Sequence, residues 1–222
     1  MTAADVTSIL ALTLGVSLAA TTLCVPPALA LGFGLARGAL PFPSVVRALI
    51  TLPMVMPPVA VGLALLWLLG RSSPLAPLWQ ALGLDLVFSP YAAALAAAVV
   101  GFPLLARSAE QSFSEIDPGF EEVARSLGCS PIASFFRVSL PLARRGLLYG
   151  ALLCFTRALG EFGATAVVAG IIPGRTETLS LGIWSRIQIG DDSGAALLVA
   201  VSFSLALAAM VAAERLLGRE VR

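Results

Sequence analysis

Lysine and histidine are both absent from this sequence of 222 residues, and all 14 basic residues are arginine. Without lysine the chain has no P-loop, because that phosphate-binding motif ends in Gly-Lys-Ser/Thr. Without histidine it lacks the usual side chain for proton transfer near neutral pH and the commonest metal ligand. We therefore expect no metal, no cofactor and no ATP or Mg²⁺ site in this chain, and any ATP-driven step requires a separate protein.

Charged residues are scarce too. They make up 12% of the chain, against about a quarter in soluble domains, while 58% of residues are hydrophobic and the mean hydropathy is +0.94. The net charge of +1 comes from arginines scattered among apolar runs, whereas nucleic-acid binding requires a concentrated basic patch. The composition indicates a membrane protein that lies in the lipid bilayer and binds no nucleic acid.

Cysteine is rare, and the three residues (Cys24, Cys129 and Cys154) are an odd number without metal-ligand spacing. We interpret them as small hydrophobic residues. The amino terminus carries Asp5 and no basic stretch, and its apolar run is too long for a signal peptide. It is therefore predicted to be a retained span.

The long apolar stretches predict the fold. A helix needs about 20 apolar residues to cross a bilayer, and five stretches reach that length: 8–36, 45–70, 87–106, 146–172 and 194–218. The predicted fold class is all-α, a polytopic transmembrane helical bundle that forms one domain over residues 1–222.

The arginines predict the orientation, because short loops rich in Lys or Arg stay in the cytoplasm. With the amino terminus outside, ten arginines fall on one side and three on the other, and Arg157 stays inside the membrane. The larger set is Arg37, Arg47, Arg107, Arg125, Arg137, Arg144, Arg145, Arg215, Arg219 and Arg222; the smaller is Arg71, Arg175 and Arg186. We predict a multi-pass protein of the bacterial cytoplasmic membrane, with its amino terminus outside and its carboxyl terminus inside.

Prolines within or beside the spans remove backbone donors and bend helices. They are Pro26 and Pro27, Pro53, Pro57 and Pro58, and Pro90 and Pro103. Ordinary packing explains such kinks when neighbouring helices satisfy the freed carbonyls. The alternative is that the run from Pro53 to Pro58 shapes a cavity or gate, which makes Thr51, Pro57 and Pro58 candidates for the translocation pathway.

The predicted cytoplasmic loop, 108–145, contains signals for two short helices. Asp117 and Pro118 are typical of a helix start, two glutamates follow where the helix dipole favours acids, and Gly128 is a stop signal. Ser130 and Pro131 repeat the start signal.

The first of these helices is amphipathic. Its apolar face consists of Phe120, Val123, Ala124 and Leu127, and its other faces carry Glu121, Glu122, Arg125 and Ser126. Such a face can rest on its own bundle, on lipid headgroups or in the groove of a partner protein, and periodicity does not decide among these.

The run Glu122-Val123-Ala124-Arg125-Ser126-Leu127-Gly128, followed by Leu140-Pro141, resembles the EAA motif of binding-protein-dependent ABC importer permeases. Only Val123 departs from the usual alanine. The resemblance implies the type I permease fold and a coupling helix that docks on a cytoplasmic ATPase through Phe120, Glu121, Glu122, Val123, Ala124, Arg125, Leu127 and Gly128. It also implies a homodimer, two ATPase subunits and an extracytoplasmic binding protein that meets the outer loops. A homodimer further suits a chain of five spans, because closed two-fold dimers are the commonest oligomers.

Two charges lie near the centre of the predicted fourth span. Arg157 and Glu161 are four residues apart, and so on one face of a continuous helix. Charges at that depth are costly and normally pair or face a polar path. They can be a structural pair or part of an anion pathway together with Thr156, Gly160 and Thr165, and the sequence leaves both readings open.

The stretch 155–165, Phe-Thr-Arg-Ala-Leu-Gly-Glu-Phe-Gly-Ala-Thr, resembles the molybdate branch of these permeases, as does 172–179. Sulfate/thiosulfate permeases share the Arg and Gly-Glu core, so sulfate, thiosulfate and tungstate remain alternative substrates. Two other classes are a secondary anion transporter or channel, which leaves the amphipathic loop helix without a role, and an intramembrane enzyme. The enzyme would need a second catalytic group beside Glu161.

Overall fold

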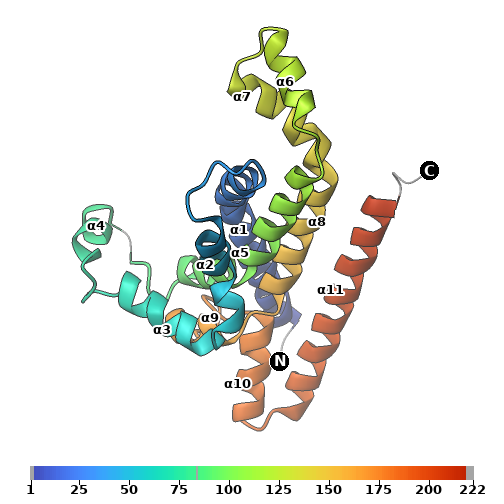
Figure 1. The fold of residues 1–222 in the computed structure, drawn as a ribbon. Coiled ribbons are helices and arrows are strands. Elements are labelled where there is room, and N and C mark those ends of the chain that lie inside the picture. Colours follow the sequence, from blue (N-terminus) through green and yellow to red (C-terminus); the bar gives the residue numbers. More distant parts are fainter. Residues whose placement is uncertain (1–2, 84, 219–222) are drawn as a thin grey trace.

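The computed structural model describes residues 3–83 and 85–218, and these residues form helices joined by turns (Figure 1). The long helices are α1 (Ala3–Ala36), α5 (Pro90–Ser114), α8 (Leu140–Leu159) and α11 (Asp192–Gly218). Shorter ones are α2 (Pro43–Val55), α3 (Pro58–Leu69), α4 (Ala76–Ala81), α6 (Gly119–Ser126), α7 (Pro131–Ser134), the π-helical turn η1 (Phe135–Ser139), α9 (Gly163–Val168) and α10 (Leu179–Gln188). Within the described part, four helices are long and apolar enough to cross a membrane, or up to five if the bent pair α2–α3 counts as one span. The helical fold class is confirmed.

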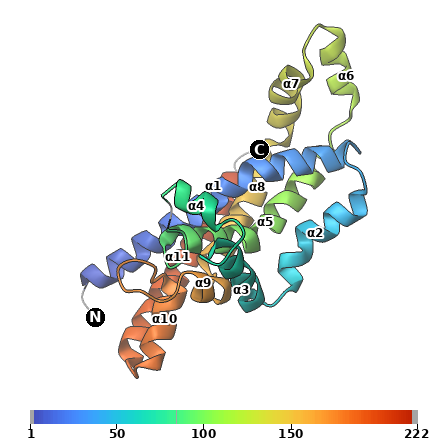
Figure 2. The same cartoon turned by 90° about the vertical axis from the view of Figure 1, so that its left-hand side faces the viewer.

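The predicted second span, 45–70, is wrong as a single helix. It consists of α2 and α3, which meet at an angle of 109° (Figure 2). The residue before a proline is driven out of the helical region by the proline ring, and two such positions occur in succession. Met56, before Pro57, has ψ 143°, and Pro57, before Pro58, has ψ 130°.

The predicted fourth span, 146–172, is also wrong as a continuous helix. Helix α8 ends at Leu159, and a short break precedes α9. On its other side the apolar helical segment begins earlier than predicted, at Pro131, and runs through α7 and η1 into α8. The break places Glu161 between two helices, outside the regular turn that its spacing from Arg157 suggested.

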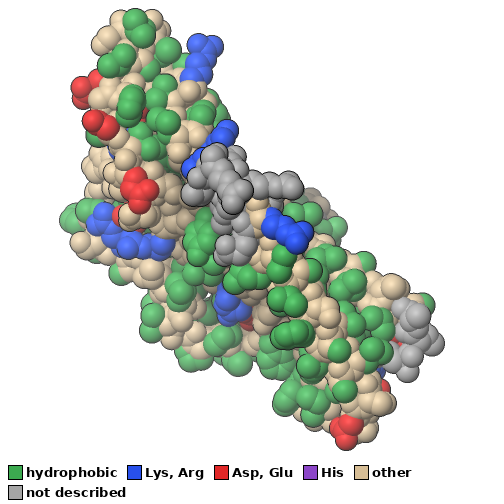
Figure 3. Space-filling model, turned by 90° about the vertical axis from the view of Figure 1, so that its right-hand side faces the viewer, with side chains coloured by type: hydrophobic (Ala, Val, Ile, Leu, Met, Phe, Trp, Pro, Cys, Tyr) green, Lys and Arg blue, Asp and Glu red, His purple; other side chains and the backbone are tan. Residues whose placement is uncertain are grey.

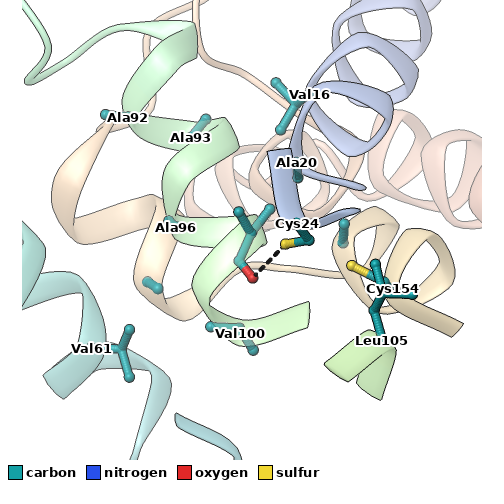
Figure 4. Close-up of a cluster of buried hydrophobic side chains, with 14 of the residues drawn as sticks. Val16, Ala20, Cys24, Val61, Ala92, Ala93, Ala96, Val100, Leu105 and Cys154 are labelled. Carbon is teal, nitrogen blue, oxygen red and sulfur yellow. Dashed lines mark hydrogen bonds between the residues drawn. The ribbon is translucent and has the colours of Figure 1, made fainter. Parts of the chain in front are cut away.

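The core lies where α1, α5 and α8 pack together, and many of its residues are small (Figure 4). Ala20, Ala92 and Ala96 are fully buried. In membranes small residues let helices approach closely, and packing then supplies the attraction. Cys24 and Cys154 are free thiols buried in this core, as expected of small hydrophobic residues, whereas Cys129 is only partly buried and lies outside the core.

Much of the outer surface is apolar. Hydrophobic side chains are spread over the face of the molecule shown in Figure 3, and those of α11 that are exposed include Leu197, Phe203 and Leu207. In Figures 1 and 2, helices α6 and α7 project from one end of the bundle, while α10 lies at the other end near the start of α1. Exposed apolar side chains along spanning helices suit contact with lipid.

Candidate functional site

Helix α6 starts and ends close to where the sequence predicts. Its first helical residue is Gly119, one position after the predicted start at Pro118, and Asp117 accepts a hydrogen bond from the Gly119 N–H through Oδ1 at 2.8 Å. Gly128, at φ 90°, follows the helix in a left-handed conformation that glycine adopts without strain. Ser130 Oγ accepts from the Ala133 N–H at 3.2 Å and caps α7 as predicted. The two-helix prediction for the loop is confirmed.

The apolar face of α6 is uncovered. Phe120, Val123 and Leu127 are 58%, 60% and 81% exposed, and only Ala124 is buried against the chain itself. Glu122, the first residue of the EAA-like run, is exposed as well. Because exposed apolar side chains at a polar end of the molecule mark an interaction surface, this face is available to a partner.

Glu121, which the resemblance places among the coupling residues, does not lie on the exposed face of α6. Its carboxylate turns inward and forms an ion pair with Arg37, with Nη2 and Nε of Arg37 at 2.7 and 3.0 Å from Oε1. Ser139 donates to the same oxygen at 2.8 Å. Burial alone raises the pKa of Glu121, but the hydrogen bonds from Arg37 and Ser139 and the charges of Arg37 and Arg125 outweigh it and hold the pKa below its usual value. Glu121 therefore stays ionised and binds Arg37 and Ser139 of its own chain.

Near the middle of the bundle Arg157 and Glu161 form an ion pair of 2.8 Å between Nη1 and Oε2. The Glu161 side chain is 2% exposed and that of Arg157 35%. The other carboxylate oxygen of Glu161 accepts a hydrogen bond from the Ala164 N–H at 2.9 Å. One carboxylate thus neutralises Arg157 and satisfies a donor at the start of α9, a helix end that would otherwise leave N–H groups unpaired.

Arg157 lines a cavity of about 130 Å³ at the bend between α2 and α3, where it meets Met54, Met56 and Pro58. Val100 and Leu104 of α5 form another wall. The structure therefore brings together two regions that the sequence nominates separately for the pathway, the proline run and the charges of the fourth span. A half-exposed guanidinium beside an otherwise apolar cavity can contact an oxyanion through its planar donors.

The other pathway candidates do not line this cavity. Thr51 donates to the Arg47 carbonyl and Thr156 to the Leu153 carbonyl, both within their own helices. Thr165 is buried in the core, and Gly160 is exposed just after α8. Pro57 shapes the bend without lining the cavity.

Sequence reasoning missed a charged cluster where α2 meets α5. Glu110, 8% exposed, accepts from Arg47 at 2.7 Å and also pairs with Arg107. The two arginines entered the prediction only as positive charges on the cytoplasmic side. Glu110 lies three residues after Arg107, which was a signal that at least one of the two arginines is paired. The periodicity of the sequence does not show which helix Glu110 faces.

A family model for the inner membrane component of binding-protein-dependent transport systems matches residues 28–222. This chain belongs to that permease family. Its predicted membership is thereby confirmed, and the permease is a transport subunit with several apolar membrane helices.

The relatives of the permease include molybdenum and sulfate transport permeases. It is 37% identical over 205 residues to the molybdenum transport system permease protein ModB of Escherichia coli, covering 91% of this chain and 90% of that protein. The identity is also 37% to the protein of that name from Mycobacterium bovis, covering 92% and 78%. The sulfate transport system permease protein CysW of Synechococcus elongatus is 40% identical over 153 residues, 69% of this chain and 54% of that protein.

The permease also shares its fold with a solved ABC transporter. The MetNI methionine ABC transporter in inward-facing conformations contains a chain that matches with a TM-score of 0.69 at 21% identity, covering 98% of this chain and 95% of that one. This likeness confirms the type I permease fold.

Beside α4, a cavity of about 820 Å³ is lined by Arg71, Asp85 and Arg175 together with apolar residues of α3 and α4. Arg71 and Asp85 lie 3.5 Å apart and are 88% and 83% exposed. Two of the three arginines that the sequence assigns to the outer side therefore share one open surface.

Proposed function

We propose that this chain is the membrane-spanning permease of an ABC importer for molybdate or a similar tetrahedral oxyanion. The observation that carries the proposal is its likeness to molybdenum transport permeases over nine-tenths of its length, together with an arginine beside a cavity in the bundle. The alternative substrate is sulfate, which the likeness to a sulfate permease over 153 residues favours. Tungstate and thiosulfate share the same tetrahedral chemistry.

The proposed assembly is a homodimer of the permease with two cytoplasmic ATPase subunits and one extracytoplasmic binding protein. The exposed apolar side chains of α6 support docking on the ATPases. The lack of lysine supports the assignment of ATP and Mg²⁺ to those subunits. The open cavity with Arg71 and Arg175 supports contact of the outer loops with the binding protein.

The proposed orientation puts α6 in the cytoplasm and the amino terminus outside, with residues 1–222 as one permease domain. The asymmetry of the arginines supports it. Helix α6 and the start of α1 also lie at opposite ends of the bundle (Figure 1). Arg219 and Arg222, which the arginine count includes, lie outside the described residues.

In the proposed mechanism ATP draws the two ATPases together, the α6 helices move with them, and the bundle turns its cavity from the inner to the outer side. Hydrolysis then resets the bundle. Arg157 offers donors to the passing anion, while its pairing with Glu161 keeps the attraction weak enough for release. Pro58, at the bend between α2 and α3, forms part of the cavity wall opposite Arg157 and moves with the bend.

The test is anion uptake by vesicles that hold the complete complex. We expect molybdate uptake that depends on ATP and on the binding protein, stops when the ATPase is inactivated, and is competed by tungstate more strongly than by sulfate. Uptake that continues with an inactive ATPase contradicts the importer and supports the secondary transporter. If sulfate competes better than molybdate, sulfate is the substrate of the permease.

A further inference from the structure

The carboxyl end of α1 positions Arg37 toward the loop that contains α6. The Arg37 N–H still bonds the Phe33 carbonyl, and Gly38, at φ 64°, then ends the helix. Its positive charge lies at the carboxyl end of α1, where the helix dipole favours it. The ring of Phe33 lies 5.6 Å below the guanidinium. Contacts within α1 thus hold Arg37 in place, in addition to its contacts with other helices.

The guanidinium of Arg37 joins three separate segments. Nε and Nη2 bind the Glu121 carboxylate of α6, and Nη1 donates to the Phe113 carbonyl of α5 and to the Ile116 carbonyl in the α5–α6 turn, at 3.1 and 3.2 Å. Its side chain is 14% exposed and that of Glu121 12%. A planar group with several fixed donors is suited to locking such a junction.

The same segments pack through aromatic rings behind the ion pair. Phe33 of α1 meets Phe113 of α5 edge-on at 5.3 Å between ring centroids, and meets Phe135 of η1 edge-on at 5.0 Å. Phe113 and Phe135 close the triangle at 5.8 Å. Ser139, which donates to Glu121, lies in the same π-helical turn as Phe135. The three packed aromatic rings therefore form a rigid support for the ion pair between Arg37 and Glu121.

Helix α6 has two faces with different tasks. Phe120, Val123 and Leu127 point away from the chain, while Glu121 points back to Arg37. The face proposed to dock on the ATPase and the face fixed to α1 belong to one helix of eight residues. Such a short helix moves as a unit, so displacement of its outer face displaces Glu121.

We propose that Arg37 is a positioning residue that fixes α6 to the ends of α1 and α5 through Glu121, so that movement imposed on α6 by the ATPase passes into these two spans. The inference rests on the proposed function, because it requires an ATPase that moves α6. Helices α1 and α5 pack along each other through the core, so movement delivered at Arg37 reaches the interior of the bundle.

The test compares uptake and ATP hydrolysis in the same vesicles holding permease, ATPase and binding protein. The variants are Arg37→Ala, Glu121→Gln and the double change. We expect uptake per ATP to fall about tenfold in either single variant, within the usual range of coupling between sites, while the KM for ATP stays unchanged. The double variant should be no worse than the singles, because both remove one junction. Glu115→Gln is the matched control, since Glu115 is exposed after α5 and accepts a hydrogen bond from Gln111 of that helix, and it should keep the wild-type ratio.

Wild-type uptake per ATP in Arg37→Ala overturns the inference, as do losses that multiply in the double variant. If Arg37→Ala fails to insert, Glu121→Gln decides, because it keeps the side-chain volume and removes only the charge. If the wild-type complex shows no ATP-driven anion uptake, the proposed function is contradicted instead. If the complex takes up sulfate in place of molybdate, uptake per ATP is measured with sulfate.

Discussion

Arg157 and Glu161 are joined across the end of helix α8, with the arginine in the last turn and the carboxylate in the break that follows. The pair is therefore local in sequence but does not lie on one helix face. Because Glu161 also binds the Ala164 N–H, its carboxylate has a second task that an arginine in its place cannot perform.

This second task changes what charge reversal should do at the pair. The singles Arg157→Glu and Glu161→Arg each place like charges together, and the double change restores attraction but leaves the Ala164 N–H without its acceptor. We expect the double variant to recover only part of the lost uptake, with Glu161→Gln milder than Glu161→Ala because the amide keeps an acceptor. Breaking a buried pair costs about 3–5 kcal/mol, and the partial exposure of Arg157 reduces that cost. Thermal unfolding in detergent and vesicle uptake measure the two effects, and full recovery in the double variant contradicts the capping role.

Gly128 should couple hydrolysis to uptake through its backbone conformation. A Cβ added there meets nothing within 4 Å, but φ is 90°, so any other residue is strained by roughly 1–2 kcal/mol. We expect Gly128→Leu to insert normally, to retain ATP hydrolysis and to lose most uptake per ATP. Gly15→Ala is the control, because Gly15 lies inside α1 with open space around it. Unchanged uptake in Gly128→Leu counts against a coupling role for this turn.

Glu110 should hold α2 against α5. Removing its carboxylate leaves Arg47 and Arg107 facing each other, whereas removing Arg47 leaves Glu110 still paired with Arg107. Glu110→Ala should therefore destabilise the permease more than Arg47→Ala, by about 1–3 kcal/mol for the loss of a buried charged partner. Thermal unfolding of the two variants side by side checks the order, and equal effects contradict it.

Gly62 should be essential for the contact between α3 and α9. A Cβ at this position lies 2.6 Å from the Ala164 carbonyl oxygen and 2.9 Å from the Ala164 Cα, and backbone atoms cannot move aside as a flexible side chain does. We expect Gly62→Ala to cost about 1–3 kcal/mol through overpacking and to lower uptake, because α9 follows the break that holds Glu161. Gly15→Ala again provides the comparison, and wild-type thermal stability in Gly62→Ala contradicts the expectation.

Local signals predicted local structure well. Ser130, Gly128 and the proline pair at 57 and 58 act on their own backbone, so the α7 cap, the turn after α6 and the bend after α2 follow from the chain alone. The two broken spans show the limit of reasoning from hydropathy. Apolar composition measures compatibility with lipid and does not detect where the backbone leaves the helix.

The sequence by itself determined that this chain is an apolar helical bundle with an amphipathic helix in its most polar segment, because composition and periodicity act at short range. Only the tertiary structure decided which charges meet. Arg37 finds Glu121 84 residues away, and Arg47 finds Glu110 across 63. The reason is physical: an ion pair depends on distance in space, and where separate helices cross is set by how their small residues pack together.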